Sequence, residues 1–264
     1  MIEIGINPVA FGNVRWYGIM VALAIAIIIV WVAWQVRRGA NIKYDTVFTA
    51  ALVGIPSGVV VSRLIHVIDR WDYYSRNLGE IVGGDGLTIY GAVLGAALGI
   101  WVYSKFSKFQ FGYLADLIAP GLILAQVVGR IGCLINGCCY GTVCSLPWGI
   151  VYTNPDSLGP LGIAVHPTQV YEIIYLFIMF GIVMLFKGRL NPPGSLFMVY
   201  LGLYSLWRFG IDFMREGTSF LFGLHQAQII AIIVLAIVIP VLLVKTRWVK
   251  AGEGVETVKE IESI

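Results

Sequence analysis

Residues 228–244 read QIIAIIVLAIVIPVLLV, a run without a single charged side chain. Such a run is typical of a helix that crosses a lipid bilayer, which needs about 20 predominantly apolar residues. The whole chain shares this character, since 58% of its 264 residues are hydrophobic and only 12% are charged, with a mean hydropathy of +0.84. Soluble proteins carry about 25% charged residues. The chain is therefore predicted to be an integral membrane protein without a separate soluble domain.

Seven segments are apolar enough to be membrane helices, at about residues 16–35, 46–68, 88–104, 113–132, 169–186, 195–214 and 225–244. We expect an all-α integral membrane fold with seven transmembrane helices. Residues 1–250 are expected to form a single membrane domain, and residues 251–264 a short cytoplasmic tail. The first apolar run ends in Arg37 and Arg38 rather than in a small-residue cleavage site, which favours a retained helix over a signal peptide.

The basic residues predict the orientation of these helices, because lysine and arginine accumulate in cytoplasmic loops. All seven lysines follow the first, third, fifth or seventh predicted helix. The N-terminus is therefore expected outside and the C-terminus in the cytoplasm. The loops after the second, fourth and sixth helices would then face outward, including a long, turn-rich loop over about residues 133–168.

Two arginines lie inside otherwise apolar sequence, Arg130 in VVGRIGC and Arg208 in YSLWRFGIDFMRE. Ionisable groups at membrane depth are costly and usually functional, although an arginine at a helix end is often only an interfacial anchor. The guanidinium fork suits phosphate oxygens and does not lose its charge. Two such groups on the outward side indicate a phospholipid head group as ligand. Asp212, four residues after Arg208, is expected to pair with it and to fix its orientation.

Other polar residues have a structural and a functional interpretation. In HPTQVYE, at 166–172, Thr168 is a good helix N-cap. Glu172 would then lie near the N-terminus of this helix. Its carboxylate is either stabilised there by the positive end of the helix dipole or points into a site. In the functional interpretation, Tyr90 donates a hydrogen bond or, beside arginines, acts as a base. In the structural interpretation, it belongs to the aromatic belt at the membrane interface. Tyr17, in RWYG, is an interface anchor by default and a weaker site candidate.

The four cysteines lie at 133, 138, 139 and 144, a spacing of C-x4-C-C-x4-C. This spacing differs from the C-x2-C pairs of zinc ribbons, so a metal is the weakest interpretation and none is expected. On an oxidising outer face, local disulfides are favoured. Three connectivities are open, and a reactive thiol is an alternative.

These residues resemble the prolipoprotein diacylglyceryl transferases, bacterial enzymes that lipidate lipoprotein precursors. The resemblance spans nearly the whole chain and rests on six blocks: RWYG (15–18), SRLIHV (62–67), DGLTIYGAVLG (85–95), GRIGCLINGCCYG (129–141), HPTQVYE (166–172) and YSLWRFGIDFMRE (204–216). It implies transfer of the diacylglyceryl group of phosphatidylglycerol to the lipobox cysteine of a prolipoprotein. This step forms a thioether, releases glycerol phosphate and begins lipoprotein maturation.

The resemblance also implies a multi-pass protein of the bacterial inner membrane, with its active site toward the outer leaflet. Its partners would be phosphatidylglycerol, the lipobox of a prolipoprotein signal peptide and membrane lipid; we expect no cofactor and no nucleic acid. Predicted as catalytic are Arg130, Arg208 and Tyr90, the two arginines as ligands of the phosphate. Predicted to bind substrate are Tyr17, Arg63, Asn136, Gly141, Glu172, Tyr204 and Asp212.

Four positions depart from the family pattern. Tyr90 replaces a common histidine that is often cast as the base, Cys133 replaces asparagine, Cys138 replaces glutamate, and Asp212 replaces a usual glutamate. Two alternatives to the transferase therefore stay open. One is a paralogous membrane protein that modifies another thiol or exchanges thiols and disulfides. The other is a non-catalytic lipid-binding or transport protein that kept the arginine pocket.

Overall fold

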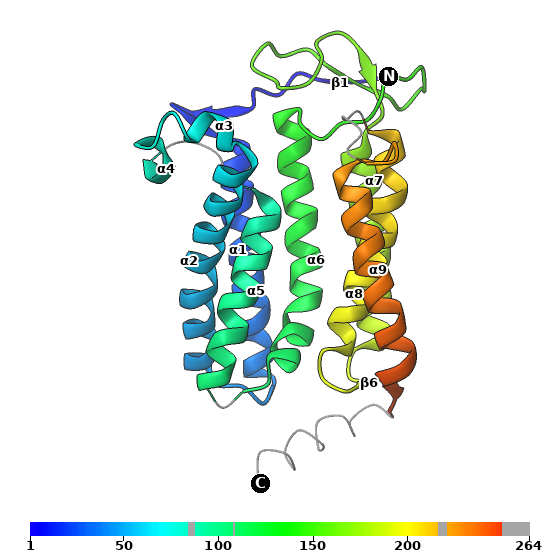
Figure 1. Cartoon of the computed structure of the whole chain (residues 1–264). Helices are drawn as coiled ribbons and strands as arrows, with labels where there is room; N and C mark the ends of the chain where they lie inside the picture. The colour runs from blue at the N-terminus through cyan, green and yellow to red at the C-terminus, as the bar shows by residue number, and fades with distance from the viewer. Residues whose placement is uncertain (84–87, 108, 216–220, 250–264) are drawn as a thin grey trace. The chain divides into compact units, whose positions relative to one another are not determined.

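A computed structural model of the chain describes residues 1–83, 88–107, 109–215 and 221–249 (Figure 1). Helices dominate this part of the chain. The chain divides into two compact units, one formed by residues 1–35 and 115–264 and the other by residues 36–114. The predicted tail at 251–264 lies outside the described residues, and the single seven-helix domain stays a prediction.

The long helices coincide with the apolar segments of the sequence. They are α1 (Trp16–Arg37), α2 (Tyr44–Asp69), α5 (Ile89–Phe106), α6 (Phe111–Asn136), α7 (Thr168–Phe186), α8 (Ser195–Ile211) and α9 (Gln226–Lys245). Within the described residues, five of them are long and apolar enough to cross a membrane, namely α1, α2, α6, α7 and α9. A mostly helical membrane protein is therefore confirmed, while seven crossings stay a prediction.

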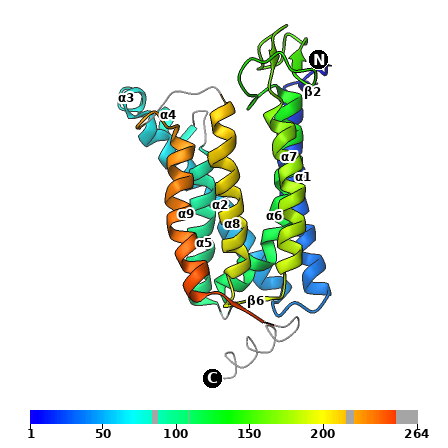
Figure 2. The same cartoon turned by 90° about the vertical axis from the view of Figure 1, so that its right-hand side faces the viewer.

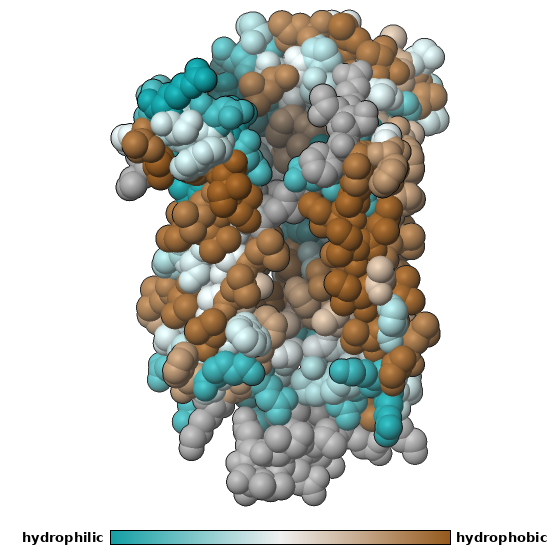
Figure 3. Space-filling view, in the orientation of Figure 1, coloured by the Kyte–Doolittle hydropathy of each residue, from teal (hydrophilic) through white to brown (hydrophobic). Residues whose placement is uncertain are grey.

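The core of the first unit lies between α6, α7 and α8. It contains eight buried side chains spaced three or four residues apart along each helix, so that they share one face: Ala119, Ile123, Val127, Leu176, Met179, Val183, Leu196 and Tyr200. α9 packs along α8, as Figures 1 and 2 both show. Hydrophobic side chains cover the visible faces of α8 and α9 (Figure 3). Such surfaces suit helices that face lipid.

Asp116 fixes the start of α8 against α6. Its two carboxylate oxygens accept hydrogen bonds from the backbone N–H groups of Gly194, at 2.7 Å, and Phe197, at 2.8 Å. The first N–H groups of a helix have no partner within that helix. A partly buried carboxylate on a neighbouring helix therefore takes the place of a local cap and holds the two helices in register.

A small sheet covers the end of this unit where α6 stops and α7 begins (Figure 1). It consists of β1 (Ile2–Ile4), β4 (Ile150–Tyr152) and β5 (Ala164–Val165), with β4 parallel to β1 and antiparallel to β5. A hairpin of β2 (Val9–Phe11) and β3 (Val14–Arg15) precedes α1. The predicted loop begins too early, because α6 continues for one more turn, to Asn136. Leu134 packs on the buried face of the sheet and supports this turn.

The opposite end of the unit is closed by two short strands. β6 (Leu190–Asn191) pairs with β7 (Arg247–Trp248), which joins the chain after α7 to the chain after α9. Lys187 and Lys245 therefore lie at the same end, as the sequence predicts for one side of a membrane. η1 (Asp212–Met214), a 3₁₀ turn, extends α8 at the sheet-covered end.

The second unit is built on α2 and α5, which approach each other closely at glycine residues. A Cβ added at Gly91 would lie 2.5 Å from the Ser62 Cα, and one added at Gly95 would collide with the Ser57 carbonyl oxygen. Small residues allow such close helix packing in membranes. α3 (Trp71–Tyr74) and α4 (Glu80–Gly83) follow α2.

Candidate active site

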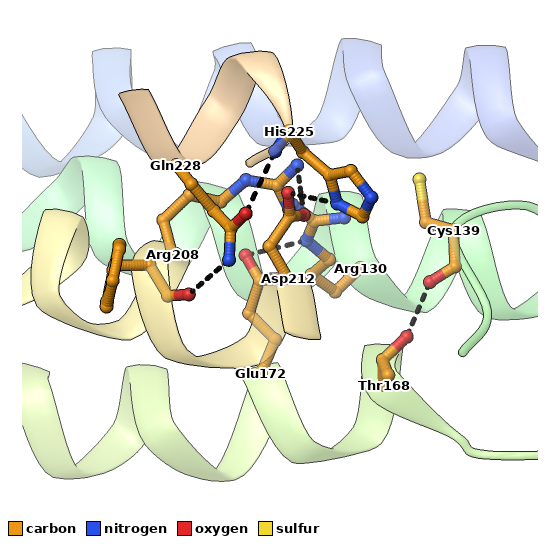
Figure 4. A network of polar contacts seen from close by, with 9 residues as sticks. Arg130, Cys139, Thr168, Glu172, Arg208, Asp212, His225 and Gln228 are labelled. Atoms are coloured by element: carbon orange, nitrogen blue, oxygen red, sulfur yellow. Dashed lines mark hydrogen bonds and ion pairs between the residues drawn. The ribbon is translucent and has the colours of Figure 1, made fainter. Parts of the chain in front are cut away.

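Arg130 forms an ion pair with a carboxylate on the next helix. Its Nε lies 2.9 Å from Glu172 Oε1, and the two side chains are 17% and 3% exposed (Figure 4). Glu172 is in the second turn of α7, so the ion pair with Arg130, rather than the helix dipole, accounts for its position. A buried carboxylate needs such a partner. The structure thus links α6 and α7 through two predicted site residues.

Arg208 forms the second ion pair. Its Nη2 lies 3.1 Å from Asp212 Oδ1, one helical turn away, as the sequence predicts. The other Asp212 oxygen lies 3.0 Å from His225 Nδ1. Asp212 is therefore buried between an arginine and a histidine, and Figure 4 shows these groups beside Arg130 and Glu172 in one network.

Tyr204 connects the two ion pairs. It lies one turn before Arg208 on α8, its hydroxyl hydrogen-bonds with Arg130, and it interacts electrostatically with Arg208 and Glu172. The sequence expected this residue in the site only through the family resemblance. The structure supplies the physical reason, because the phenol is close enough to both guanidinium groups to be influenced by their positive charges.

His225 is the residue that the sequence interpretation missed. It precedes α9 and lies outside the recognised motifs. The sequence offers one weak signal for it, namely that histidine is rare in this chain, with three residues in all. Gln228 holds it in place, because its Oε1 accepts a hydrogen bond from the His225 backbone N–H at 2.9 Å. A carboxylate can only accept, so Nδ1 donates to Asp212 and the lone pair of the neutral ring is on Nε2.

Asn136 and Tyr17 lie where α1 meets the end of α6. The Asn136 side-chain oxygen accepts a hydrogen bond from Arg15 Nη1 at 3.0 Å, which ties the RWYG motif to the last turn of α6. A Cβ added at Gly132 would lie 3.6 Å from the Tyr17 Cα, so the helices approach closely here. Tyr17 is also within electrostatic range of Arg130.

Gly141 lies where three segments converge. Its N–H donates to the His166 carbonyl oxygen at 2.9 Å. A Cβ at this position would lie 2.6 Å from the Met214 carbonyl oxygen and 2.8 Å from both His166 Cβ and Thr168 Cγ2. A glycine is required here to close the loop over the ends of α7 and η1.

Thr168 differs from its expected role. It is the first residue of α7 rather than its N-cap, and its hydroxyl donates to the Cys139 carbonyl oxygen at 2.6 Å. The neighbouring Gln169 donates from Nε2 to the Cys138 carbonyl oxygen at 2.7 Å. The start of α7 therefore anchors the turn that carries the two adjacent cysteines.

The predicted disulfides are absent, because all four cysteines are free thiols. The Sγ atoms of Cys133, Cys138 and Cys139 nevertheless lie within 4.8 Å of one another. Hydrogen bonds from the Cys133 and Cys138 thiols, together with the positive charges of Arg215 and Arg130, lower the pKa of the Cys139 thiol.

An apolar cavity adjoins the Arg208 end of α8. It has a volume of about 630 Å³ and its walls include Trp148, Tyr175, Trp207 and Met214. The rings of Tyr175 and Trp207 stack with centroids 4.5 Å apart. The apolar cavity and the charged groups around Arg208 therefore lie close together in the first unit.

Two predicted site residues belong to the second unit. Arg63 donates from Nε to the Ile81 carbonyl oxygen at 2.8 Å and lies over the Tyr74 ring. Tyr90 is in the first turn of α5, and its side chain lies outside the described part of the structure. Their proximity to Arg130 stays a prediction.

The chain is similar to proteins of one known family. The model of a family described as prolipoprotein diacylglyceryl transferase matches residues 7–244. A phosphatidylglycerol–prolipoprotein diacylglyceryl transferase of Dehalococcoides mccartyi (strain ATCC BAA-2266 / KCTC 15142 / 195) is 47% identical over 257 residues, which cover 96% of this chain and 99% of that protein. A protein of the same name from Clostridioides difficile (strain 630) is 34% identical over 223 residues, or 84% and 86% of the two chains. The chain belongs to the prolipoprotein diacylglyceryl transferase family.

Proposed function

We propose that this chain transfers the diacylglyceryl group of phosphatidylglycerol to the lipobox cysteine of prolipoproteins, forming a thioether and releasing glycerol phosphate. The observation that carries the proposal is the pair of arginines, each held by a buried carboxylate and joined through Tyr204. Relatives up to 47% identical over nearly their whole length are named for this reaction.

Arg130 and Arg208 would bind the phosphate. A guanidinium has five N–H donors, and each ion pair has one arginine nitrogen in contact with its carboxylate, so further donors remain for phosphate oxygens. The carboxylates hold the donors in position before substrate arrives. Preorganised donors stabilise the charge that develops on a leaving group, and loss of one typically raises a barrier by about 2.7–4 kcal/mol.

His225 would accept the proton of the acceptor thiol. Asp212 orients the ring through Nδ1, so that Nε2 is the basic nitrogen, an arrangement that activates nucleophiles in other enzymes. As the proton moves to Nε2, the sulfur attacks the glyceryl carbon and the C–O bond to phosphate breaks. The electron pair leaves with glycerol phosphate. Tyr90, the sequence-based candidate for the base, would then orient the nucleophile.

The charge pattern supports a proposal for where the reaction takes place. Lys187 and Lys245 lie at the β6–β7 end of the first unit, whereas Arg130, Arg208 and His225 lie toward the sheet-covered end (Figure 1). The lysine-rich end would be cytoplasmic. We infer seven crossings of the bacterial inner membrane, with an outside N-terminus and a site open to the outer leaflet.

The substrates are amphiphilic, and the apolar cavity beside α8 suits them. Its aromatic walls would hold acyl chains of phosphatidylglycerol or the apolar part of the signal peptide while the arginines hold the head group. Tyr17, Asn136 and Gly141 would shape the entrance from the sheet-covered end, and Arg63 stays a substrate-binding candidate that the family resemblance implies.

The decisive experiment combines purified protein, phosphatidylglycerol and a lipobox peptide. The peptide should gain the mass of one diacylglyceryl group, and a matched peptide with serine at the lipobox cysteine should gain none. A lipid-binding or transport protein would bind phosphatidylglycerol and leave both peptides unchanged. A thiol-exchange protein would instead give a peptide mass that reductant reverses. Either of these results would refute the transferase proposal.

A further inference from the structure

We propose that Cys133, Cys138 and Cys139 form a binding site for one zinc ion, held by three thiolates. Their Sγ atoms lie within 4.8 Å of one another, and all three are free thiols. Three thiolates at about 2.3 Å from a tetrahedral zinc lie about 3.8 Å apart. Shifts of about 1 Å or less would therefore complete the site. The proposal does not depend on the transferase reaction.

The backbone is folded so that the three sulfurs meet. Cys133 is buried in the last turn of α6, and the chain then turns back through Gly137 and Cys139, at φ of +73° and +65°. A left-handed conformation is disfavoured for cysteine and is maintained only where its surroundings enforce it. Here Thr168 and Gln169 hold the carbonyl groups of Cys139 and Cys138. Figure 4 shows the Cys139 carbonyl facing Thr168 and its Sγ directed away.

The electrostatic surroundings suit a thiolate cluster. Three thiolates and one Zn²⁺ carry a net charge of −1, and the positive charges of Arg130 and Arg215 act on Cys139. Asn136 Nδ2 also lies 3.8 Å from Cys138 Sγ, within range of a weak N–H···S bond. Such outer contacts orient thiolate ligands and stabilise their charge.

Zinc accounts for the cluster better than a disulfide does. A disulfide would use two of the sulfurs and leave the third thiol beside it without a covalent partner, whereas a metal uses all three. Thiolates select soft or borderline ions, and the fourth position of zinc would be filled by water or by another thiol. The ion would tie the end of α6, one turn beyond Arg130, to the turn that leads to Gly141.

The first test measures the metal content of the full chain, purified in detergent with reductant and without chelator. We expect about one zinc per chain, and intense thiolate-to-cobalt absorption when cobalt replaces it. Cys138→Ser/Cys139→Ser should lose at least nine-tenths of the metal and the cobalt bands. Cys144→Ser is the matched control, since Cys144 lies outside the cluster, and it should keep both. Equal metal in the double variant, or reduced wild-type protein without metal, would overturn the proposal.

The second test needs no variant in the cluster. With zinc bound, N-ethylmaleimide should label about one thiol per chain, Cys144, and chelation in denaturant should raise this number to four. If labelling is restored only by reductant and the intact mass is two hydrogens low, the cysteines form a disulfide and the zinc site is refuted. Four labelled thiols before chelation would refute it as well.

Discussion

Asp212→Asn tests the central part of the site, because one carboxylate serves two partners. Its oxygens lie 3.1 Å from Arg208 Nη2 and 3.0 Å from His225 Nδ1. Asparagine has one oxygen and one NH₂ group, so it can accept from only one partner. If the NH₂ group faces His225, the ring must accept through Nδ1 and Nε2 carries the proton, which removes the base.

The expected loss follows from these two contacts. A positioned general base contributes about 10²–10⁴ in rate. Loss of a hydrogen bond to a charged group costs about 1.5–3 kcal/mol. Part of this loss would appear as weaker binding of phosphatidylglycerol through Arg208. We therefore expect kcat to fall by about 10²–10³ and KM for phosphatidylglycerol to rise by up to about tenfold. Asp212→Glu keeps the carboxylate and should retain most activity.

The assay is diacylglyceryl transfer to a lipobox peptide, measured over a range of phosphatidylglycerol concentrations. Asp156→Asn is the matched control, since the hydrogen bonds of Asp156 to Arg15 and Asn154 use its backbone carbonyl oxygen and N–H rather than its carboxylate. His225→Gln should reproduce the loss in kcat without the change in KM. If folded Asp212→Asn keeps kcat within about threefold of wild type, the roles assigned to Asp212 and His225 are wrong.

Three further predictions test other parts of the structure. Arg130→Lys keeps the charge but loses the planar fork, so transfer should fall by about 10²–10³, and unchanged kcat/KM would remove Arg130 from phosphate binding. Gly141→Ala should lower stability by about 1–3 kcal/mol through overcrowding, seen as a lower thermal midpoint. Gly181→Ala, where a Cβ meets nothing within 4 Å, should cause no such loss. Asp116→Ala should lower the midpoint by removing the acceptor at the start of α8, while activity per folded molecule is retained; an unchanged midpoint would contradict that role.

The helices could be predicted because a membrane helix is a local property of about 20 residues. Each expected segment corresponds to a helix in the structure, with ends that differ by a few residues. The largest difference is at the end of α6, where Leu134 packs on a sheet formed by strands from distant parts of the chain. Hydropathy has no information about such a contact, so the predicted loop began too early.

The site was predicted in part. Arg208 and Asp212 are one helical turn apart, so their pairing follows from helix geometry alone. Arg130 and Glu172 were recognised as candidates, but their ion pair joins two helices and depends on packing. The thiols illustrate the limit of spacing arguments. C-x4-C-C-x4-C favoured disulfides, whereas the fold brings three thiols together and leaves Cys144 outside.

Composition, motifs and residues within one helical turn were therefore enough to predict the membrane class, the positions of the helices, the family and the Arg208–Asp212 pair. Three features became visible only in the folded chain: Glu172 pairs with Arg130, His225 shares Asp212, and Gly141 has no room for a side chain. These contacts join residues 13 or more positions apart. Their formation depends on how helices and loops pack, which no local pattern of side chains encodes.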